Sequence, residues 1–151
     1  MTTPRRLVAL VGLGLLYACG GQPRGAVGPV PTSPEATVDQ FLAAVNANDL
    51  QRMAQLFGDE RGPSSAYMKN VARRDSIMTI LQTLLVTDSA HHLGSEPVPG
   101  HRSWRVLRMD LFRGTKQTAV PFTVLPRHGG WLVQEIDIRS LMPGASTGAA
   151  P

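Results

Sequence analysis

The spacing of apolar residues changes once along this 151-residue chain, and the change limits the folds open to it. Up to about Val86 the apolar residues recur at every third or fourth position, which places them on one side of a helix. Beyond Val86 they alternate with polar residues over short segments, which is typical of strands. Helices followed by a run of strands are the pattern of an α+β domain. We therefore predict N-terminal helices packed on a curved antiparallel sheet of three to four strands.

The first helix is predicted to begin at Pro34. Ser33 before it is a favourable N-cap, and proline is well tolerated at the first helical position because its missing N–H needs no partner there. A shorter helix is predicted over residues 50–57. The longest helical pattern covers residues 65 to about 86 and is either one helix or two helices broken near Asp75.

Three strands are predicted in the second half, at residues 102–113, 116–125 and 131–138, because each is rich in β-branched and aromatic residues. Glycine-containing turns separate them, so the strands should form a meander. A fourth, weaker strand is predicted at residues 88–96. Pro121 lies inside the middle strand and cannot donate to a neighbour, so that strand is expected to be an edge strand or to carry a bulge.

The composition divides the chain into four parts. Residues 34–142 carry the apolar periodicity and are long enough for one domain with one core. Residues 19–33 are rich in glycine and proline, which predicts a flexible tether. Residues 143–151 contain only Gly, Ala, Ser, Thr and Pro, which predicts a disordered tail. Residues 1–18 are predicted to be a signal peptide.

The signal peptide is predicted from three adjoining features. The pair Arg5-Arg6 forms a charged start, an apolar run follows at residues 7–16, and the small Ala18 stands before the predicted cut. The apolar run is too short to cross a bilayer. The segment Leu16-Tyr17-Ala18-Cys19 resembles the lipobox of bacterial lipoproteins, in which an apolar residue lies three places before a cysteine and a small residue directly before it.

The lipobox resemblance implies cleavage between Ala18 and Cys19 and a diacylglyceryl thioether on the sulfur of Cys19. Two or three acyl chains would hold the protein firmly on a membrane of the cell envelope. Gly20 follows the cysteine, and a residue other than Asp at this position implies the outer membrane, facing the periplasm, in bacteria with two membranes. The alternative is an ordinary secreted protein. Cys19 is also the only cysteine, so no disulfide forms within one chain.

Net charge argues against a nucleic-acid partner. The full chain has 15 Lys and Arg against 11 Asp and Glu. Removing Arg5 and Arg6 with the signal peptide leaves 13 against 11, which is a mature charge of +2. A nearly neutral domain has little electrostatic attraction for phosphate backbones.

Two segments resemble the NTF2-like domains of the cystatin-like group. The first is residues 34–50, which read Pro-Glu-Ala-Thr-Val-Asp-Gln-Phe-Leu-Ala-Ala-Val-Asn-Ala-Asn-Asp-Leu, and the second is Gly130-Trp131-Leu132-Val133. In that group a first helix ends in a polar turn, a short second helix follows, and a Trp-containing strand closes the sheet. The resemblance implies a cone whose mouth, between helices and sheet, holds a small apolar or amphipathic molecule. The group includes enzymes, ligand binders and assembly modules, so the resemblance does not imply one function.

Four residues are candidates for ligand binding: Tyr67, Trp104, Arg108 and Asp110. Alternate residues of a strand point to opposite faces of the sheet. One face of the strand at residues 102–113 should therefore carry Trp104, Val106, Arg108, Asp110 and Phe112, and the other should carry Leu107, Met109 and Leu111. Glu135 and Asp137, on another predicted strand, are available as charged partners for Arg102 or Arg108.

Neither a metal nor a cofactor is predicted. His91 and His92 are adjacent in a predicted strand and point to opposite faces, so they cannot bind one ion together. The sequence contains no H-E-x-x-H motif and no glycine-rich loop between a strand and a helix. The serines lack the G-x-S-x-G context of a nucleophile, and no catalytic residue is assigned.

Three functions remain open from the sequence. The first is a lipid-anchored, non-enzymatic NTF2-like domain that binds a small ligand or an envelope protein. The second is an isomerase- or hydratase-type enzyme with Asp110 as general base and Tyr67 or His92 as hydrogen-bond donor, which requires these side chains to meet in one dry cavity. The third is a structural subunit of an envelope assembly or secretion complex, with an exposed apolar strip formed by Leu107, Met109 and Leu111.

Overall fold

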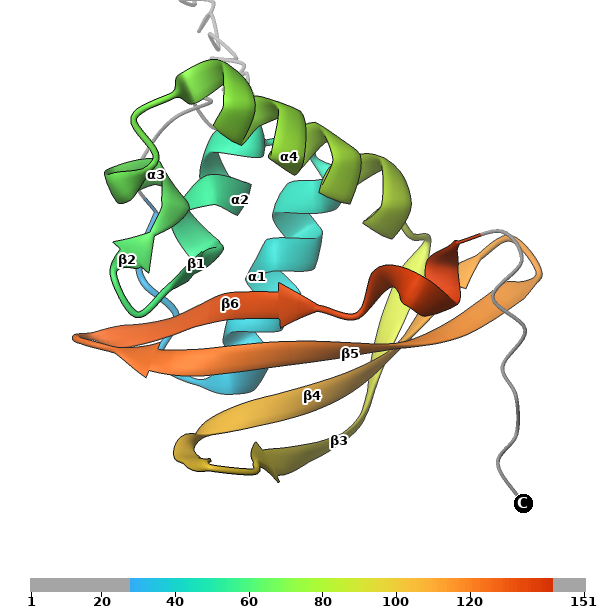
Figure 1. The fold of residues 1–151 in the computed structure, drawn as a ribbon. Helices are drawn as coiled ribbons and strands as arrows, with labels where there is room; N and C mark the ends of the chain where they lie inside the picture. The colour runs from blue at the N-terminus through green and yellow to red at the C-terminus, as the bar shows by residue number, and fades with distance from the viewer. Residues whose placement is uncertain (1–27, 143–151) are drawn as a thin grey trace, which may run out of the picture.

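Helices precede the main sheet along the chain in the computed structural model, which describes residues 28–142 (Figure 1). The helices are α1 Pro34–Asn46, α2 Leu50–Leu56, α3 Ser64–Tyr67 and α4 Val71–Leu85. A small hairpin lies between α2 and α3 and consists of β1 Gly58–Asp59 and β2 Gly62–Pro63. The main sheet contains β3 Ser89–Val98, β4 His101–Arg113, β5 Lys116–Arg127 and β6 Gly130–Ile136, followed by the 3-10 helix η1 Ile138–Leu141. The predicted α+β class is confirmed.

The main sheet is an antiparallel meander with the strand order β3-β4-β5-β6. The weak strand predicted at residues 88–96 is present as β3, which lies at an edge of the sheet and pairs with β4. Gly114 and Gly129 occupy tight turns with φ angles of 58° and 83°, which glycine adopts without steric cost. The predicted meander is therefore confirmed, with the fourth strand included.

Pro121 lies in an interior strand, because β5 pairs with both β4 and β6. Its carbonyl oxygen accepts the Asp137 N–H at 3.0 Å, and Asp137 lies just beyond the end of β6. The backbone nitrogen of Pro121, which has no hydrogen to donate, faces the same part of the chain. The register between β5 and β6 also shifts between Thr123 and Val124, which marks a bulge. Of the two arrangements that the sequence allowed for this proline, the structure has the bulge.

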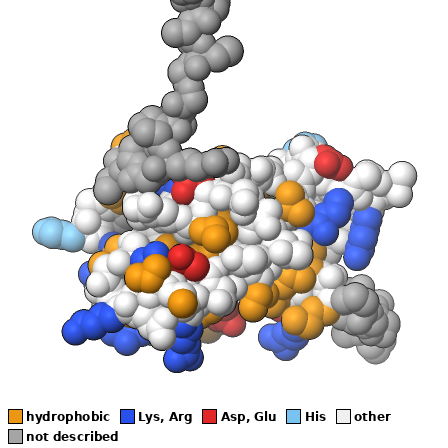
Figure 2. Space-filling model, turned by 90° about the horizontal axis from the view of Figure 1, so that it is seen from above, with side chains coloured by type: hydrophobic (Ala, Val, Ile, Leu, Met, Phe, Trp, Pro, Cys, Tyr) orange, Lys and Arg blue, Asp and Glu red, His pale blue; other side chains and the backbone are white. Residues whose placement is uncertain are grey.

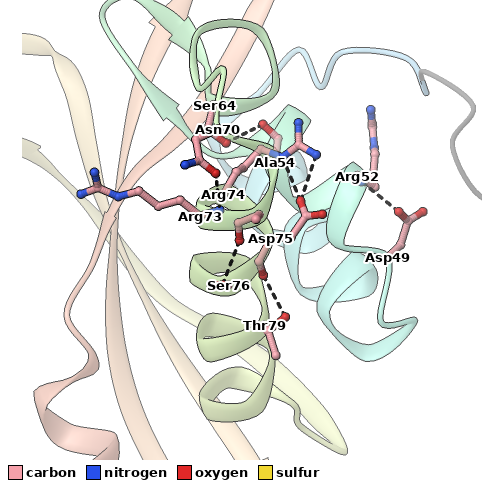
Figure 3. A network of polar contacts seen from close by, with 11 residues as sticks. Asp49, Arg52, Ala54, Ser64, Asn70, Arg73, Arg74, Asp75, Ser76 and Thr79 are labelled. Carbon is pink, nitrogen blue, oxygen red and sulfur yellow. Dashed lines mark hydrogen bonds and ion pairs between the residues drawn. The ribbon is translucent and has the colours of Figure 1, made fainter.

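Polar side chains determine where three of the helices begin. Ser33, Asp49 and Asn70 cap α1, α2 and α4, and each accepts the N–H of the residue three positions later at 2.9–3.1 Å. Figure 3 shows the caps at Asp49 and Asn70. The helical pattern predicted from residue 65 to about 86 forms two helices, α3 and α4, which was one of the two alternatives. The position predicted for the break, near Asp75, is wrong. Asp75 lies inside α4, and the chain leaves the helical conformation at residues 68–70, where Asn70 can cap the next helix.

The core lies between the helices and one face of the sheet. The strand residues Leu107, Met109 and Leu111 on this face are only 1%, 0% and 5% exposed. They form one cluster with buried side chains of the helices and of β5, among them Val38, Phe41, Met53, Met78, Val120 and Phe122. The exposed apolar strip suggested at Leu107, Met109 and Leu111 is therefore wrong, because α1 and the other helices cover this face (Figure 1).

Arg113 joins the turn between β4 and β5 to the C-terminal end of α4. Its Nε donates to the Val86 carbonyl at 2.8 Å and its Nη2 donates to the Leu84 carbonyl at 3.2 Å. Carbonyl groups at a helix C-terminus carry partial negative charge, so a cation stabilises them. Thr87 adds to this junction, because its hydroxyl lies 2.6 Å from the carbonyl oxygen of Phe112 and donates to it.

Residues 28–33, which the sequence placed in the tether, lie against the domain. Arg52 on α2 donates to the first two carbonyl oxygens of this segment, at 3.1 and 2.7 Å. The N–H of Trp131 donates to the Pro31 carbonyl at 3.1 Å, which joins the segment to β6. This part of the predicted tether is therefore bound to the domain. The predicted signal peptide, Cys19 and the predicted tail at 143–151 lie outside the described residues.

The outward side of α4 carries short hydroxyl side chains whose hydrogen bonds are made within the helix. Ser76, Thr79 and Thr83 each donate to the carbonyl four residues earlier, at 2.8–2.9 Å. Ile80 is 57% exposed among them. The view from above shows hydrophobic side chains in separate groups, with Lys and Arg toward the rim (Figure 2). The hydrophobic side chains on this side therefore lie in several separate groups rather than in one continuous patch.

Leu107→Ala should lower the free energy of unfolding by about 2–5 kcal/mol, because it removes a buried side chain and leaves a cavity. The matched control is Leu93→Ala on β3, where the leucine is 54% exposed, and the expected change there is below about 0.5 kcal/mol. Chemical denaturation of both variants measures the difference. Equally small effects would contradict the placement of Leu107 in the core.

Arg52→Ala should release residues 28–31 from the domain and lower the free energy of unfolding by about 1–3 kcal/mol, since two hydrogen bonds from a charged group are lost. The amide of Trp131 should then exchange its hydrogen faster, because its acceptor belongs to the released segment. Gln55→Ala is the control, because it removes one contact of Arg52 but leaves the guanidinium. Unchanged exchange at Trp131 would show that Arg52 does not hold the segment.

Candidate ligand-binding cleft

An open cleft of about 500 Å³ lies at the end of the sheet where β4 begins. A volume of this size is in the range of small-ligand sites. The turn between β1 and β2, the start of β4 and the middle of β6 supply its walls, and Figure 1 shows the small hairpin next to β6. The lining residues are Asp59, Glu60, Arg61, His101, Trp104 and Gln134.

Two aromatic rings form one wall. The rings of His101 and Trp104 are stacked, with centroids 4.1 Å apart and planes inclined by 23°. Trp104 lies on the face of the sheet away from the helices, because the alternation along β4 puts Leu107 on the opposite, buried face. Stacking restricts the rotation of both rings, so the wall keeps a defined shape.

A buried apolar pair lies on the same face as Trp104, apart from the main core. Leu125 and Leu132 face each other across β5 and β6 and are 1% and 4% exposed. Arg105 pairs with Val124, so the register places Trp104 next to Leu125. The aromatic wall therefore stands beside buried side chains, which favours one fixed position of the indole ring.

An ion pair forms the other wall. The guanidinium of Arg61 donates to both carboxylate oxygens of Asp59, with Nη2 2.6 Å from Oδ2 and Nε 3.2 Å from Oδ1. The same guanidinium lies over the ring of Tyr67, with its carbon 4.1 Å from the ring centroid.

The hydrogen bond from Arg61 lowers the pKa of the Asp59 carboxyl to about 2. Burial raises the pKa of the Tyr67 phenol, and the charge of Asp59 adds to this shift. At neutral pH this wall therefore holds a charged carboxylate, a charged guanidinium and a neutral phenol.

The hairpin that carries this ion pair is fixed to the sheet. Arg127 at the end of β5 donates to the Glu60 carbonyl in the turn of the hairpin. Phe57, directly before β1, forms a parallel bridge to Val133 on β6. Gly58 permits the close approach of the two short strands, because a side-chain carbon there would lie 2.1 Å from the Gly62 carbonyl oxygen. The main sheet therefore carries the aromatic wall directly and holds the hairpin wall through these contacts.

The structure separates the four candidate ligand-binding residues. Trp104 lines the cleft, and Tyr67 lies at its margin beneath Arg61. Arg108 is exposed on the same face of β4 and pairs with Glu96 of β3 at 3.3 Å, rather than with a residue of β6. Asp110 is 8% exposed and accepts a hydrogen bond from Gln117 at 2.7 Å. Arg108 and Asp110 do not line the cleft.

The side chains required by the enzyme hypothesis do not meet. His92 pairs in register with Met109, which faces the helices, and its Nε2 is 2.8 Å from Asp39 Oδ1 on α1. Asp110 is the next residue along β4 and points to the other face. Tyr67 lies near the small hairpin, beneath Arg61. The structure does not bring these three residues together.

A second cavity, of about 70 Å³, lies between the end of α4, the turn joining β4 to β5, and η1. It has room for a few water molecules. The NTF2-like resemblance implied a ligand between helices and sheet, yet none of the four candidate residues lines this cavity. Its lining residues are Leu84, Val86, Thr87, Leu111, Arg113, Lys116, Thr118 and Leu141.

Periodicity along the chain did not indicate five of the cleft residues: Asp59, Glu60, Arg61, His101 and Gln134. The hairpin has strands of only two residues, which are too short to show any periodicity. Gln134 lies where the register of β6 shifts, which alternation alone does not reveal. The one hint in the sequence is that Gly58, Asp59 and Gly62 are residues common in turns, which predicts a turn that would also contain Arg61.

No family model, no curated protein and no solved structure matches this chain. Function must therefore be inferred from the site itself. Within residues 28–142, no group of three or more His, Cys, Asp or Glu side chains could hold a metal ion. None of the helices in the described part of the chain is both long and apolar enough to cross a bilayer.

Arg61→Ala should return the pKa of Asp59 from about 2 toward its usual value of 3.8, because the hydrogen bond from Arg61 is the largest cause of the shift. NMR titration of the side-chain carboxyl carbon measures this. The pKa in the folded state is lower than in the unfolded state, so the pair stabilises the fold above about pH 4 and this contribution is lost as the pH falls toward 2. Arg139→Ala, which removes the partner of Asp137 elsewhere, is the control. A wild-type pKa near 3.8 would show that the pair does not form in solution.

Proposed function

We propose that this chain is a bacterial lipoprotein whose non-enzymatic NTF2-like domain binds a small ligand at the cleft beside Trp104. The observation that carries the binding role is the cleft itself, with walls that are held in place without a ligand. The stacked rings of His101 and Trp104 hold one wall, and the pair of Asp59 and Arg61 holds the other. Groups fixed in advance lose little conformational freedom on binding.

The order of the elements supports the NTF2-like assignment. A capped first helix ends in a polar turn, a short second helix follows, and an antiparallel meander ends in the strand that contains Trp131. Trp131 packs against the core from this last strand. These features agree with the resemblance stated from residues 34–50 and 130–133.

The lipobox segment at residues 16–19 supports the anchor. Because residues 28–33 are bound to the domain, the tether between Cys19 and the domain is reduced to residues 20–27. A chain of eight residues spans at most about 28 Å. The bound segment contacts Trp131 at the start of β6, and the cleft lies at the same end of the sheet. An acylated Cys19 would therefore keep the cleft close to the membrane surface.

An envelope protein is the alternative occupant, and the edge strand β3 is the observation that favours it. Most residues of β3 are exposed, and an edge strand can pair with an extended segment of a partner. The register shift after His92 and the proline at position 97 both weaken such pairing. We therefore place the small ligand first.

Native mass spectrometry of the chain extracted from the membranes of its own cells tests the proposal. The expected mass is that of a chain beginning at Cys19 with two or three acyl chains, together with a bound small molecule. Cys19→Ala should lose both the acyl mass and the cleavage after Ala18, whereas the control Gly20→Ala should keep them. An unmodified cysteine would contradict the anchor, and a bound protein in place of a small molecule would favour the alternative occupant.

A further inference from the structure

The charges that line the cleft nearly cancel. Arg61 is matched by Asp59 at 2.6 Å, so its guanidinium is not free to bind the full charge of an anionic ligand. Glu60 in the same turn is exposed and adds one negative charge. Arg127 reaches the same turn at the Glu60 carbonyl and adds one positive charge, so the two carboxylates and two guanidiniums together sum to zero. A phosphate or carboxylate ligand would meet no excess of positive charge among these residues. The charge distribution therefore favours a neutral ligand.

The polar groups of the cleft both donate and accept hydrogen bonds. Asp59 offers carboxylate oxygens, Arg61 offers N–H groups directly beside them, and Gln134 offers both an oxygen and an NH₂ group. A hydroxyl group has the same dual character, because it donates one hydrogen and accepts on two lone pairs. Two neighbouring hydroxyl groups on a ring could therefore contact the carboxylate and the guanidinium together.

The aromatic wall requires a flat, partly apolar partner. Trp104 is half-buried and fixed by the stack with His101. The face of an aromatic ring carries partial negative charge, so it attracts the C–H bonds of a ring whose carbon atoms bear oxygen. Sugar rings present such C–H groups on one face and hydroxyl groups around the rim.

We propose that the cleft binds a neutral saccharide, with one sugar ring against Trp104 and its hydroxyl groups on Asp59, Arg61 and Gln134. This inference rests on the proposed binding function and names the chemical class of its ligand. A volume of about 500 Å³ that is open to solvent gives room for more than the one stacked ring, so a chain of sugars can continue out of the cleft. Glycans are present in the envelope that the lipobox implies.

The test uses the full chain, extracted in a detergent without a sugar headgroup, because a glycoside detergent would compete for the cleft. Three neutral trisaccharides serve as probes: N-acetylchitotriose, maltotriose and cellotriose. Calorimetry and tryptophan fluorescence follow each titration to about 10 mM, which detects even weak single-site binding. At least one probe should bind and should shift the tryptophan emission, and this shift should be lost in Trp104→Phe, which keeps only Trp131. Absence of binding by all three would overturn the inference.

Variants locate the binding. Trp104→Ala should weaken the affinity more than about tenfold, whereas Trp104→Phe keeps a ring and should lose less. Gln134→Ala should lose about three- to tenfold, the usual effect of one neutral hydrogen bond. Arg139→Ala lies outside the cleft and should bind as the wild type does. Saccharide binding that survives both Trp104→Ala and Gln134→Ala unchanged would also overturn the inference.

Two features keep the test decisive. Trp104 lies next to buried Leu125, so the alanine variant can lose stability, and Trp104→Phe and Gln134→Ala then carry the comparison. The mass of the chain from its own membranes separates this inference from the proposed function. An acylated chain with a bound small molecule that contains no sugar would refute the saccharide and leave the ligand-binding lipoprotein intact.

Discussion

The burial of one face of the meander beneath the helices is the interaction on which the rest of this structure depends. Leu107, Met109 and Phe122 are no more than 1% exposed there, and they pack in one cluster with Val38 and Phe41 of α1. Each such side chain contributes roughly 1.5–3 kcal/mol when it is removed from water. The chain contains one cysteine, so no disulfide within it adds to the stability that this packing provides.

This packing also determines where a ligand can bind. Buried side chains pack in one cluster between the helices and the sheet, and a cavity of about 70 Å³ lies near the turn joining β4 to β5. The larger cleft lies instead beside Trp104, on the face of β4 that points away from the helices. There the small hairpin between α2 and α3 supplies a second wall, because Arg127 holds its turn to the end of β5. A short insertion between two helices thus creates a site that the sheet alone would lack.

Helix starts and strand positions could be predicted from the sequence, whereas side-chain partners that depend on the strand register could not. Ser33 and Pro34 located the start of α1, and the alternation after Val86 located all four strands, because caps and periodicity are local properties. The same alternation separated Leu107 from Trp104 correctly but did not show which face the helices cover. The partner of Arg108 could not be predicted either, since it depends on the pairing of β3 with β4 and on the register shift after His92. Of the candidate ligand-binding residues, only Trp104 lines the cleft. Asp59 and Arg61, which form the opposite wall of the cleft, belong to a hairpin whose strands are too short to show a periodic pattern.

The segment at residues 28–33 determines how the domain would respond to a force that pulls on the chain before it. A force applied to the chain before Gly28 would act first on the hydrogen bonds that Arg52 of α2 and Trp131 of β6 donate to this segment. If these bonds break one after another, the six residues extend by up to about 20 Å before any helix or strand is strained. The segment would then lengthen the chain between the point of pull and the folded domain, with contacts that form again when the force is removed.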